Sequence, residues 1–577
     1  MLAETTQPVA LPKRKKRSFL TEDFVPSTWE LMEPYFKNLQ DRELLSLEDL
    51  HQWLRDWSEL EAAGGESSRW IYVRTTLDST DEVAKAELNN LYATILPKIT
   101  VADQHLKEKL VACPFVGQLD KDLFFTTIRR IKKSLELFRE ENIPLNSEMN
   151  MKQSTYGQIT GAQSIVYNGV EMTPKQAEVY LRSSDRAQRE EVFKLIAERR
   201  LQDADKLDEL LSELIQLRHQ MAVNAGFKNY LEFRFMELGR FDYTPDDCLQ
   251  FHSSVKEVIM PLVNQLSKER KEKLGLDKLK LWDLIVDTSG KPALKPCSST
   301  DDLIDKTIAC FNQLDPYFGE RIEIMKRMNY LDLGARMHKN NGGYNMSMPE
   351  LGVPFIFMNS SNSEQDLVTM VHEGGHAIQT FLTHDLELSA FKETTSEIAE
   401  VASMGMELMS MEHWDIFYSD ADDLNRARKN HLNHVLTILS KICMGDSFQF
   451  WLYTNPNHTI EERRNKWVEL VRQFTPGNID RSEAQDFLRI GYQNILHFYE
   501  VPFYYIEYAF AELGAIGLWR SFKSNQEKAI EDYKKGLALG YTKSIPEFYE
   551  TVGAKFDFSK AYLAELVEFL QGELKKL

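Results

Sequence analysis

The apolar residues of this chain recur mostly three and four positions apart, which is the period of an amphipathic α-helix. One such face contains Leu207, Leu210, Leu211, Leu214, Arg218 and Met221, and another contains Leu563, Leu566, Val567, Leu570 and Leu574, with Ser559 as its cap. Residues 353–358 form a short apolar and aromatic run that favours a strand. Residues 287–300 are rich in turn-forming residues and are expected to be a loop, the most natural break in the chain. The pattern predicts a mainly helical protein.

One predicted helix contains the sequence His372-Glu373-Gly374-Gly375-His376. Ser363 and Asp366 resemble a capping box at its start, Asn362 is a second candidate cap, and an apolar face follows at helical spacing. Histidines four positions apart lie on one helical face, about 6 Å apart along the axis. Both imidazoles can therefore reach one metal ion, and Glu373 beside them can accept a proton, which is the pattern of a zinc hydrolase. The alternative is a pair of core histidines, because so short a pattern also arises by chance.

Gly374 and Gly375 are unusual inside a helix, where each costs roughly 1 kcal/mol relative to alanine. Their missing side chains would let a neighbouring helix or a substrate backbone approach closely. We therefore expect a close backbone contact at this point of the metal helix.

A catalytic zinc site needs a third protein ligand. A second helix is predicted after the cap candidates Thr394, Thr395 and Ser396, with apolar residues Ile398, Val401, Met404 and Leu408 on one face. It carries Glu397, Glu400 and Glu407 on neighbouring turns, and a carboxylate there would complete a His-His-Glu site. Spacing alone does not choose between Glu397 and Glu400, and a surface position is the ordinary alternative for each.

These motifs resemble the oligoendopeptidase F and thimet oligopeptidase group of zinc peptidases, in which H-E-x-G-H is followed by a helix with a Glu-Val-Ala-Ser type segment. Residues 400–403 match that segment, 28 positions after His372. The resemblance implies that Glu400 is the third ligand and that Glu407 supports the site from behind. Similar segments begin at Thr155, Tyr167, Tyr180 and Arg240, so the resemblance runs from about residue 150 to the carboxyl end.

The same family places groups that bind the substrate and the developing oxyanion in a late aromatic segment, here residues 497–509. His497 and Tyr508 match those positions. Tyr504 and Tyr505 compete with Tyr508, because Ile506 interrupts the family's Tyr-x-Tyr-x-Tyr rhythm. For any single aromatic residue in this run, core packing is the alternative.

The family resemblance also implies a substrate-binding role for the segment before the metal helix. Gly342 and Gly343 predict a flexible loop that, with Tyr344, would cover the peptide. The strand expected at residues 353–358, including Phe355 and Ile356, would pair with the substrate backbone. The alternative for this strand is a plain core element.

Charge and composition limit the setting of the protein. The 577 residues include 69 Lys and Arg against 88 Asp and Glu, a net charge of −19, which argues against a nucleic-acid partner. The basic run at residues 13–17 is expected to lie in a solvated tail rather than to act as a nuclear import signal. The chain lacks an apolar stretch of membrane-spanning length and an apolar signal-peptide core, so no membrane partner is expected. Five scattered cysteines without a C-x-x-C motif favour a reducing cytoplasm.

The resemblance implies a mainly α, two-lobed body with a small β-sheet beside the metal helix and a deep central channel. We expect a flexible basic tail at 1–20, an amino-terminal helical lobe at 21–200 and a catalytic region at 201–577. The expected activity is cleavage of internal bonds in short unfolded peptides, with one Zn²⁺ ion as cofactor. Two alternatives stay open: a dipeptidyl carboxypeptidase-like exopeptidase, and a peptide-binding protein with a dead site. The sequence leaves the oligomeric state open.

Overall fold

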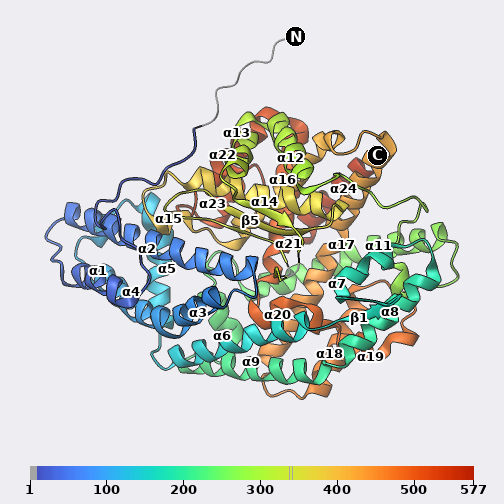
Figure 1. Cartoon of the computed structure of the whole chain (residues 1–577), viewed down its shortest axis with the longest axis horizontal. Coiled ribbons are helices and arrows are strands. Elements are labelled where there is room, and N and C mark those ends of the chain that lie inside the picture. Colours follow the sequence, from blue (N-terminus) through green and yellow to red (C-terminus); the bar gives the residue numbers. More distant parts are fainter. Residues whose placement is uncertain (1–9, 337, 341) are drawn as a thin grey trace, which may run out of the picture. The chain divides into compact units, whose positions relative to one another are not determined.

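The computed structural model describes residues 10–336, 338–340 and 342–577, apart from the side chain of Ser154. It is mainly helical, as expected (Figure 1). The chain separates into two compact units. Unit 1 contains residues 1–136, 295–427 and 514–556, and unit 2 contains residues 137–294, 428–513 and 557–577. The boundaries fall within α17 (Ala421–Thr454) and α21 (Tyr505–Ser524), among other places. They differ from the division expected at residue 200, because each unit gathers segments that are distant in the chain.

Unit 1 contains long helices and one small sheet. Its helices and turns are α1 (Trp29–Asp41), α2 (Leu47–Leu77), α3 (Glu82–Asn90), the π-helical η1 (Leu91–Ile95), α4 (Leu96–Ala112), η2 (Val116–Gln118), α5 (Lys121–Leu137), α12 (Thr300–Leu314), α13 (Pro316–Arg327), α14 (Glu364–Thr383), α15 (Ser389–Lys392), α16 (Ser396–Ser410), η5 (Met411–Ile416), α22 (Gln526–Ala538) and α23 (Ile545–Thr551). The metal helix expected from the sequence is α14.

The sheet of unit 1 has the strand order β3-β5-β4. β3 (Leu331–Gly334) runs parallel to β5 (Phe355–Ser360), and β4 (Tyr344–Met346) runs antiparallel to β5 on its other side. β5 is therefore the central strand, close to the position predicted for it. Both β4 and β5 pack against α14, as Figure 1 shows for β5 and α14.

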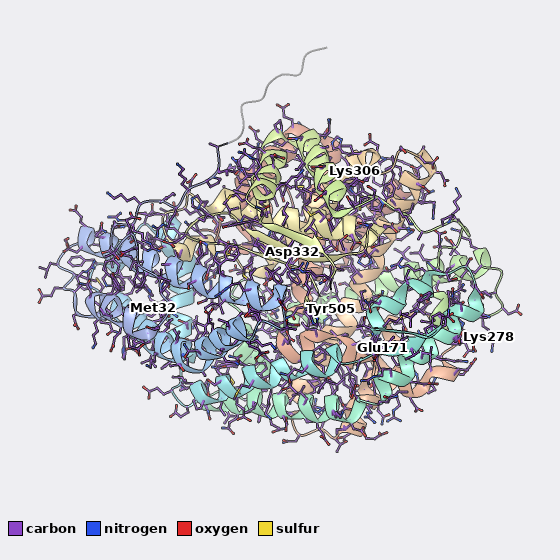
Figure 2. All side chains as sticks on the ribbon, in the orientation of Figure 1. Met32, Glu171, Lys278, Lys306, Asp332 and Tyr505 are labelled. Atoms are coloured by element: carbon purple, nitrogen blue, oxygen red, sulfur yellow. The ribbon has the colours of Figure 1, made fainter. Side chains whose placement is uncertain are left out.

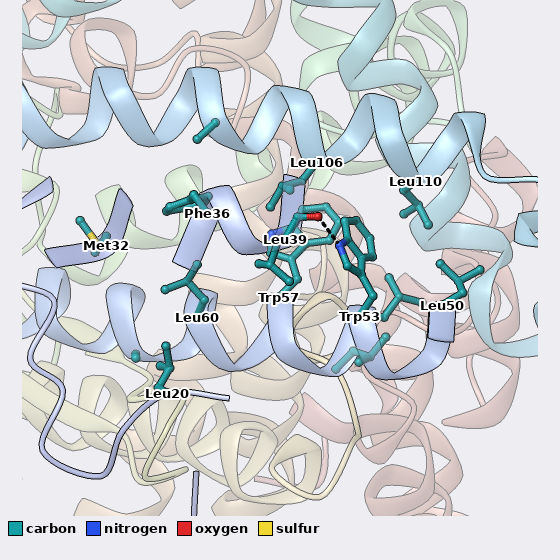
Figure 3. Close-up of a cluster of buried hydrophobic side chains, with 14 of the residues drawn as sticks. Leu20, Met32, Phe36, Leu39, Leu50, Trp53, Trp57, Leu60, Leu106 and Leu110 are labelled. Carbon is teal, nitrogen blue, oxygen red and sulfur yellow. Dashed lines mark hydrogen bonds between the residues drawn. The ribbon is translucent and has the colours of Figure 1, made fainter. Parts of the chain in front are cut away.

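A hydrophobic core of unit 1 lies between α1, α2 and α4 (Figure 3). Trp53 is buried in this core, and its indole N–H donates to the carbonyl of Leu39 at 2.8 Å. Leu20 is buried in this core, although it was expected in a flexible tail. Arg17 is buried as well, and its guanidinium binds the Glu350 carboxylate at 2.7 and 2.9 Å. Arg17 and Leu20 therefore do not belong to a flexible tail, because burial and a long-range ion pair hold them in place. Residues 1–9 lie outside the described residues.

Unit 2 is a helical assembly with one hairpin. Its elements are α6 (Asn142–Gly161), β1 (Ile165–Tyr167), β2 (Val170–Met172), α7 (Pro174–Ala177), η3 (Glu178–Arg182), α8 (Arg186–Leu201), α9 (Ala204–Asn224), α10 (Tyr230–Glu237), α11 (Pro245–Lys273), η4 (Leu281–Asp283), α18 (Ile460–Phe474), η6 (Ser482–Ala484), α19 (Gln485–Arg489), η7 (Gly491–Asn494), α20 (Leu496–Glu500) and α24 (Lys560–Leu574). Both apolar faces predicted from the sequence are helices, α9 and α24.

Two local predictions, a helix cap and a loop, are confirmed. The side chain of Ser559 caps α24 by accepting the N–H of Tyr562 at 3.3 Å. Residues 287–299 form a loop, and one boundary between the units falls there. Among the described helices, none is long and apolar enough to span a bilayer.

Candidate metal and catalytic site

Helix α14 starts where its capping residues predict. Ser363 and Asp366 form a capping box, in which Asp366 Oδ2 accepts the Ser363 N–H at 2.7 Å. Asn362, the other candidate cap, instead precedes the helix with a φ of 63°. The capping fixes the helical register, and His372 and His376 follow about two and three turns later on one face. Their ring centroids are 4.9 Å apart.

The two glycines of α14 are explained by close packing. A Cβ at Gly375 would lie 2.6 Å from Ser403 Cα, and nearer still to the Ala402 carbonyl oxygen, both in the backbone of α16. A Cβ at Gly374 would lie 2.7 Å from the ring of Phe311 on α12. The predicted close backbone contact is therefore confirmed at Gly375, and it brings the two helices together beside the histidines.

This contact places a carboxylate opposite both imidazoles. Glu400 Oε2 lies 3.4 Å from His372 Nε2 and 3.8 Å from His376 Nε2. The three residues each offer one donor atom, and these atoms all lie within 4.8 Å of one another. In a tetrahedral zinc site with bonds of about 2.1 Å, ligand atoms are about 3.4 Å apart, so this donor set fits the ion. Glu397 is also buried on α16, but its carboxylate does not belong to this group.

Polar neighbours fix the orientation of these donors. His372 Nδ1 is 2.6 Å from Glu407 Oε1, which leaves Nε2 to face Glu400. The hydroxyl of Ser403 lies 3.2 Å from Glu400 Oε2 and 3.0 Å from the Glu400 carbonyl oxygen. Such outer contacts set the tautomer and direction of metal-binding side chains. Glu407 was expected in this supporting position, whereas Ser403 was noted only as part of a motif.

Burial and nearby charges shift the pKa values of the residues in this cluster. These values apply to the protein without a metal ion. Burial acts to lower the pKa of His372, but its hydrogen bond to Glu407 and the surrounding carboxylates outweigh that effect and raise the pKa to about 10. Burial, helped by the charge of His372, lowers the pKa of His376 to about 3. Burial raises the pKa of Glu373 to about 7, against the opposing effect of His372. Glu373 is thereby suited to exchange a proton near neutral pH.

The sheet corrects part of the substrate-binding prediction. β5 cannot take up a further strand, because Ile356 is paired with Leu331 of β3 on one side and with Asn345 of β4 on the other. Phe355 and Ile356 are also buried, at 3% and 0% exposure. Direct roles for both residues in pairing with the substrate are therefore wrong. A strand order of this kind cannot be read from periodicity.

β4, like β3, is an edge strand of this sheet, and among the described strands it pairs only with β5. Its residues are half-buried, and the side-chain amide of Asn345 donates to the Glu373 carbonyl at 3.1 Å, which ties β4 to the metal helix. Gly342, just before β4, has a φ of 105°, and Gly343 packs against the carbonyl of Phe357. Tyr344 stacks on Phe357, so its ring has a packing role.

In unit 2, the aromatic residues singled out from the sequence form one cluster. The His497 ring centroid lies 6.0 Å from that of Tyr504, 5.0 Å from Tyr505 and 5.8 Å from Tyr508. All four side chains are half-buried, whereas Ile506 is fully buried on another face of the helix. Ile506 thus does not interrupt the tyrosine cluster in space. The cluster and the candidate metal ligands belong to different units, and their meeting at one site stays a prediction.

The cluster depends on a glycine that no sequence pattern pointed to. A Cβ at Gly445 of α17 would lie 2.8 Å from the ring of Tyr505, which is labelled in Figure 2. The absent side chain makes room for that ring, and the local burial raises the pKa of Tyr505. Tyr505 is therefore held in place more tightly than a surface tyrosine.

Comparison with known proteins gives the family. The family model of peptidase family M3 matches residues 179–568, and that of the peptidase M3 N-terminal domain matches residues 19–138. The chain belongs to peptidase family M3. It is accordingly a peptidase, with relatives named oligoendopeptidase F.

Individual relatives and solved structures similar to this M3 peptidase also have peptidase names. An oligoendopeptidase F homolog of Borreliella burgdorferi is 21% identical over 79% of this chain and 77% of its own length. Oligopeptidase PepF of Bacillus subtilis is 24% identical over 49% of this chain and 42% of its own length, so that match spans less than half of the relative. Among solved structures, PZ peptidase A with an inhibitor has a TM-score of 0.90 at 25% identity, covering 95% of this chain and 97% of that one.

Proposed function

We propose that this M3 peptidase is a zinc-dependent oligoendopeptidase. The observation that carries the proposal is the convergence of His372, His376 and Glu400 on one point, with Glu373 beside them on the same helix as the histidines. The donor distances suit a tetrahedral ion, and two imidazoles with one carboxylate favour zinc. When bound, zinc would supply Lewis acidity toward water and the scissile carbonyl.

The remaining chemistry falls to the side chains of the protein. Glu373 would accept a proton from the attacking water and pass it to the leaving amine, and its place on α14 beside His372 and His376 supports this role. Glu407 would hold His372 in the tautomer that presents Nε2. His497 and one of the tyrosines, Tyr508 or Tyr505, would donate to the substrate and to the developing oxyanion.

The edge of β4 that faces away from β5, and that pairs with no other described strand, replaces β5 as the proposed binding site for the peptide. Its connection to Glu373 through Asn345 supports this choice, because a peptide paired there would pass close to α14. Gly342, Gly343 and Tyr344 keep their proposed place next to the substrate. Short peptides in a central channel, and a location in the cytoplasm, are proposed from the family resemblance.

A peptide blocked at both ends tests endopeptidase action. It should be cut internally by the zinc-loaded enzyme, with products identified by mass spectrometry. Cleavage of only those peptides that have a free carboxyl end would favour the exopeptidase alternative, and binding without cleavage would favour the dead-site alternative.

Full-length denatured casein should resist digestion while a short peptide of casein sequence is cut, and rapid digestion of both would refute the closed channel.

A further inference from the structure

Two buried arginines of unit 2 hold the segment that carries His497 and the tyrosines. Arg218 lies on α9 with 0% exposure, and the Arg240 side chain, just after α10, is 1% exposed. Burying a guanidinium is unfavourable unless its donors find acceptors. The groups that accept hydrogen bonds from each arginine therefore indicate the role of that arginine.

Arg240 binds the start of α21 at two points. Its Nη2 donates to the carbonyl of Phe503, and Nε and Nη2 donate to Glu507 Oε1 at 3.1 and 2.8 Å. Phe503 has a φ of 66°, a left-handed conformation that a bulky residue adopts only when its surroundings enforce it. Gln449 Oε1 supports the same residue by accepting its N–H at 2.6 Å.

These bonds bracket the tyrosines. The turn at Phe503 immediately precedes Tyr504 and Tyr505, and Glu507 is the neighbour of Tyr508 in the first turn of α21. Anchoring both Phe503 and Glu507 to one planar guanidinium fixes where α21 begins and how its first turn is rotated. The directions of the tyrosine side chains follow from that rotation.

Arg218 holds the other end of the segment. Its Nη1 donates to the carbonyl of Phe498 at 2.9 Å and to the hydroxyl of Tyr453 at 2.8 Å, and its Nη2 donates to the carbonyl of Tyr499. Phe498 directly follows His497 in the short helix α20. Arg218 thus fixes the backbone that orients His497.

We propose that Arg218 and Arg240 are positioning residues for the peptidase reaction, Arg218 acting through His497 and Arg240 through a tyrosine of α21. This inference rests on the proposed function, in which those side chains contact the transition state. Lysine keeps the charge but lacks the planar fork that binds a carbonyl and a second acceptor together. Arginine-to-lysine variants therefore remove the positioning with the least other change.

Arg189 offers a matched control in unit 2. It is buried, and it binds the Asp283 carboxylate and the Trp282 carbonyl, a donor pattern like that of Arg240. We expect Arg240→Lys and Arg218→Lys to lower kcat by about 10-fold or more with KM changed by less than about threefold, since misplacement by 1 Å can cost about 100-fold. Arg189→Lys should lower Tm similarly while leaving kcat within about twofold, and zinc content should be equal in all variants.

Double variants test the route of each effect. In a variant that already lacks the side chain being positioned, the added lysine substitution should lower kcat by about twofold or less. We expect this for Arg240→Lys combined with Tyr508→Phe or with Tyr505→Phe, whichever tyrosine is the donor, and for Arg218→Lys combined with His497→Ala. A purely structural role would instead give the full loss in every background.

The proposal is overturned if the Arg240 and Arg218 variants lose no more kcat than Arg189→Lys, or if their losses add fully in all backgrounds. Should Arg240→Lys fail to fold, Glu507→Gln keeps the side-chain size and removes the charge that pairs with Arg240. That variant should lower kcat with the same dependence on the tyrosine, and an unchanged kcat would overturn the role of Arg240. Failure of the proposed function would differ, because wild-type turnover would then not depend on zinc or on Glu373.

Discussion

Replacing Gly375 with alanine should displace α14 and α16, the two helices that carry the proposed zinc ligands, from each other. The new Cβ would lie 2.6 Å from Ser403 Cα, whereas ordinary contact begins at 3.4 Å, so α14 and α16 must separate by about 1 Å. Backbone atoms cannot rotate away as a side chain can. Overpacking of this kind costs roughly 1–3 kcal/mol, against about 1 kcal/mol that alanine returns through its helix propensity.

The same separation would move the Glu400 carboxylate too far from the two imidazoles for all three to bind one zinc ion well. The 3.4 and 3.8 Å distances from Glu400 to the imidazole nitrogens already match or slightly exceed the tetrahedral spacing. Adding about 1 Å should weaken zinc binding by 10-fold or more, an effect comparable to losing an outer-shell partner, for which about 10- to 100-fold is typical. Zinc affinity is measured by competition with a chelator, and stability by urea unfolding of the zinc-free protein.

Gly374→Ala is the control in the same helix. It gains the same helix propensity, but its Cβ meets the tip of the buried Phe311 ring, so the strain falls on a side chain of α12 and not on the backbone of α16. It should therefore retain zinc far better than Gly375→Ala. Equal zinc affinity in the two variants would refute the argument that the backbone contact at Gly375 sets the ligand geometry.

Three further predictions concern the same cluster. Glu407→Gln should weaken zinc binding by about 10- to 100-fold in chelator competition, because His372 loses a charged partner; unchanged affinity would contradict that role. Glu400→Ala should lose zinc, measured by metal analysis of the purified protein, while Glu397→Ala retains it, and equal zinc contents would exclude Glu400 as the ligand. The zinc-free protein should keep a proton on His372 up to about pH 10, so its contribution to stability is complete below the unfolded pKa of about 6.5 and is lost as the pH rises through 10. Zinc binding at pH 8 should then release at least one proton, seen as a buffer-dependent heat in titration calorimetry, and a heat independent of the buffer would contradict the raised pKa.

The sequence was most informative where chemistry depends on local spacing. His372 and His376 lie four positions apart, so any helix brings them together, and the cost of Gly375 within a helix pointed to a close neighbour. Spacing left Glu397 and Glu400 equivalent. The packing of α16 against α14 separates them, because Glu400, and not Glu397, forms one group with both imidazoles.

Features that depend on distant partners were missed or wrong. Arg17 was expected in a tail because its neighbours are basic, but its partner Glu350 lies 333 positions away. Phe355 belongs to a correctly expected strand, yet the strand order makes that strand central rather than open to substrate. Arg218 was read as a member of an apolar helical face, and its carbonyl partners become evident only in the folded chain.

The most direct test of zinc-dependent peptidase action compares three samples on one doubly blocked peptide. These are the wild-type enzyme, the same enzyme after removal and return of zinc, and Glu373→Gln, with the zinc content of each measured. We expect about one zinc per wild-type chain, activity that disappears and returns with the ion, and a Glu373→Gln variant that retains zinc while its kcat falls by more than about 100-fold. Undiminished cleavage by the zinc-free enzyme or by Glu373→Gln would contradict the proposed site.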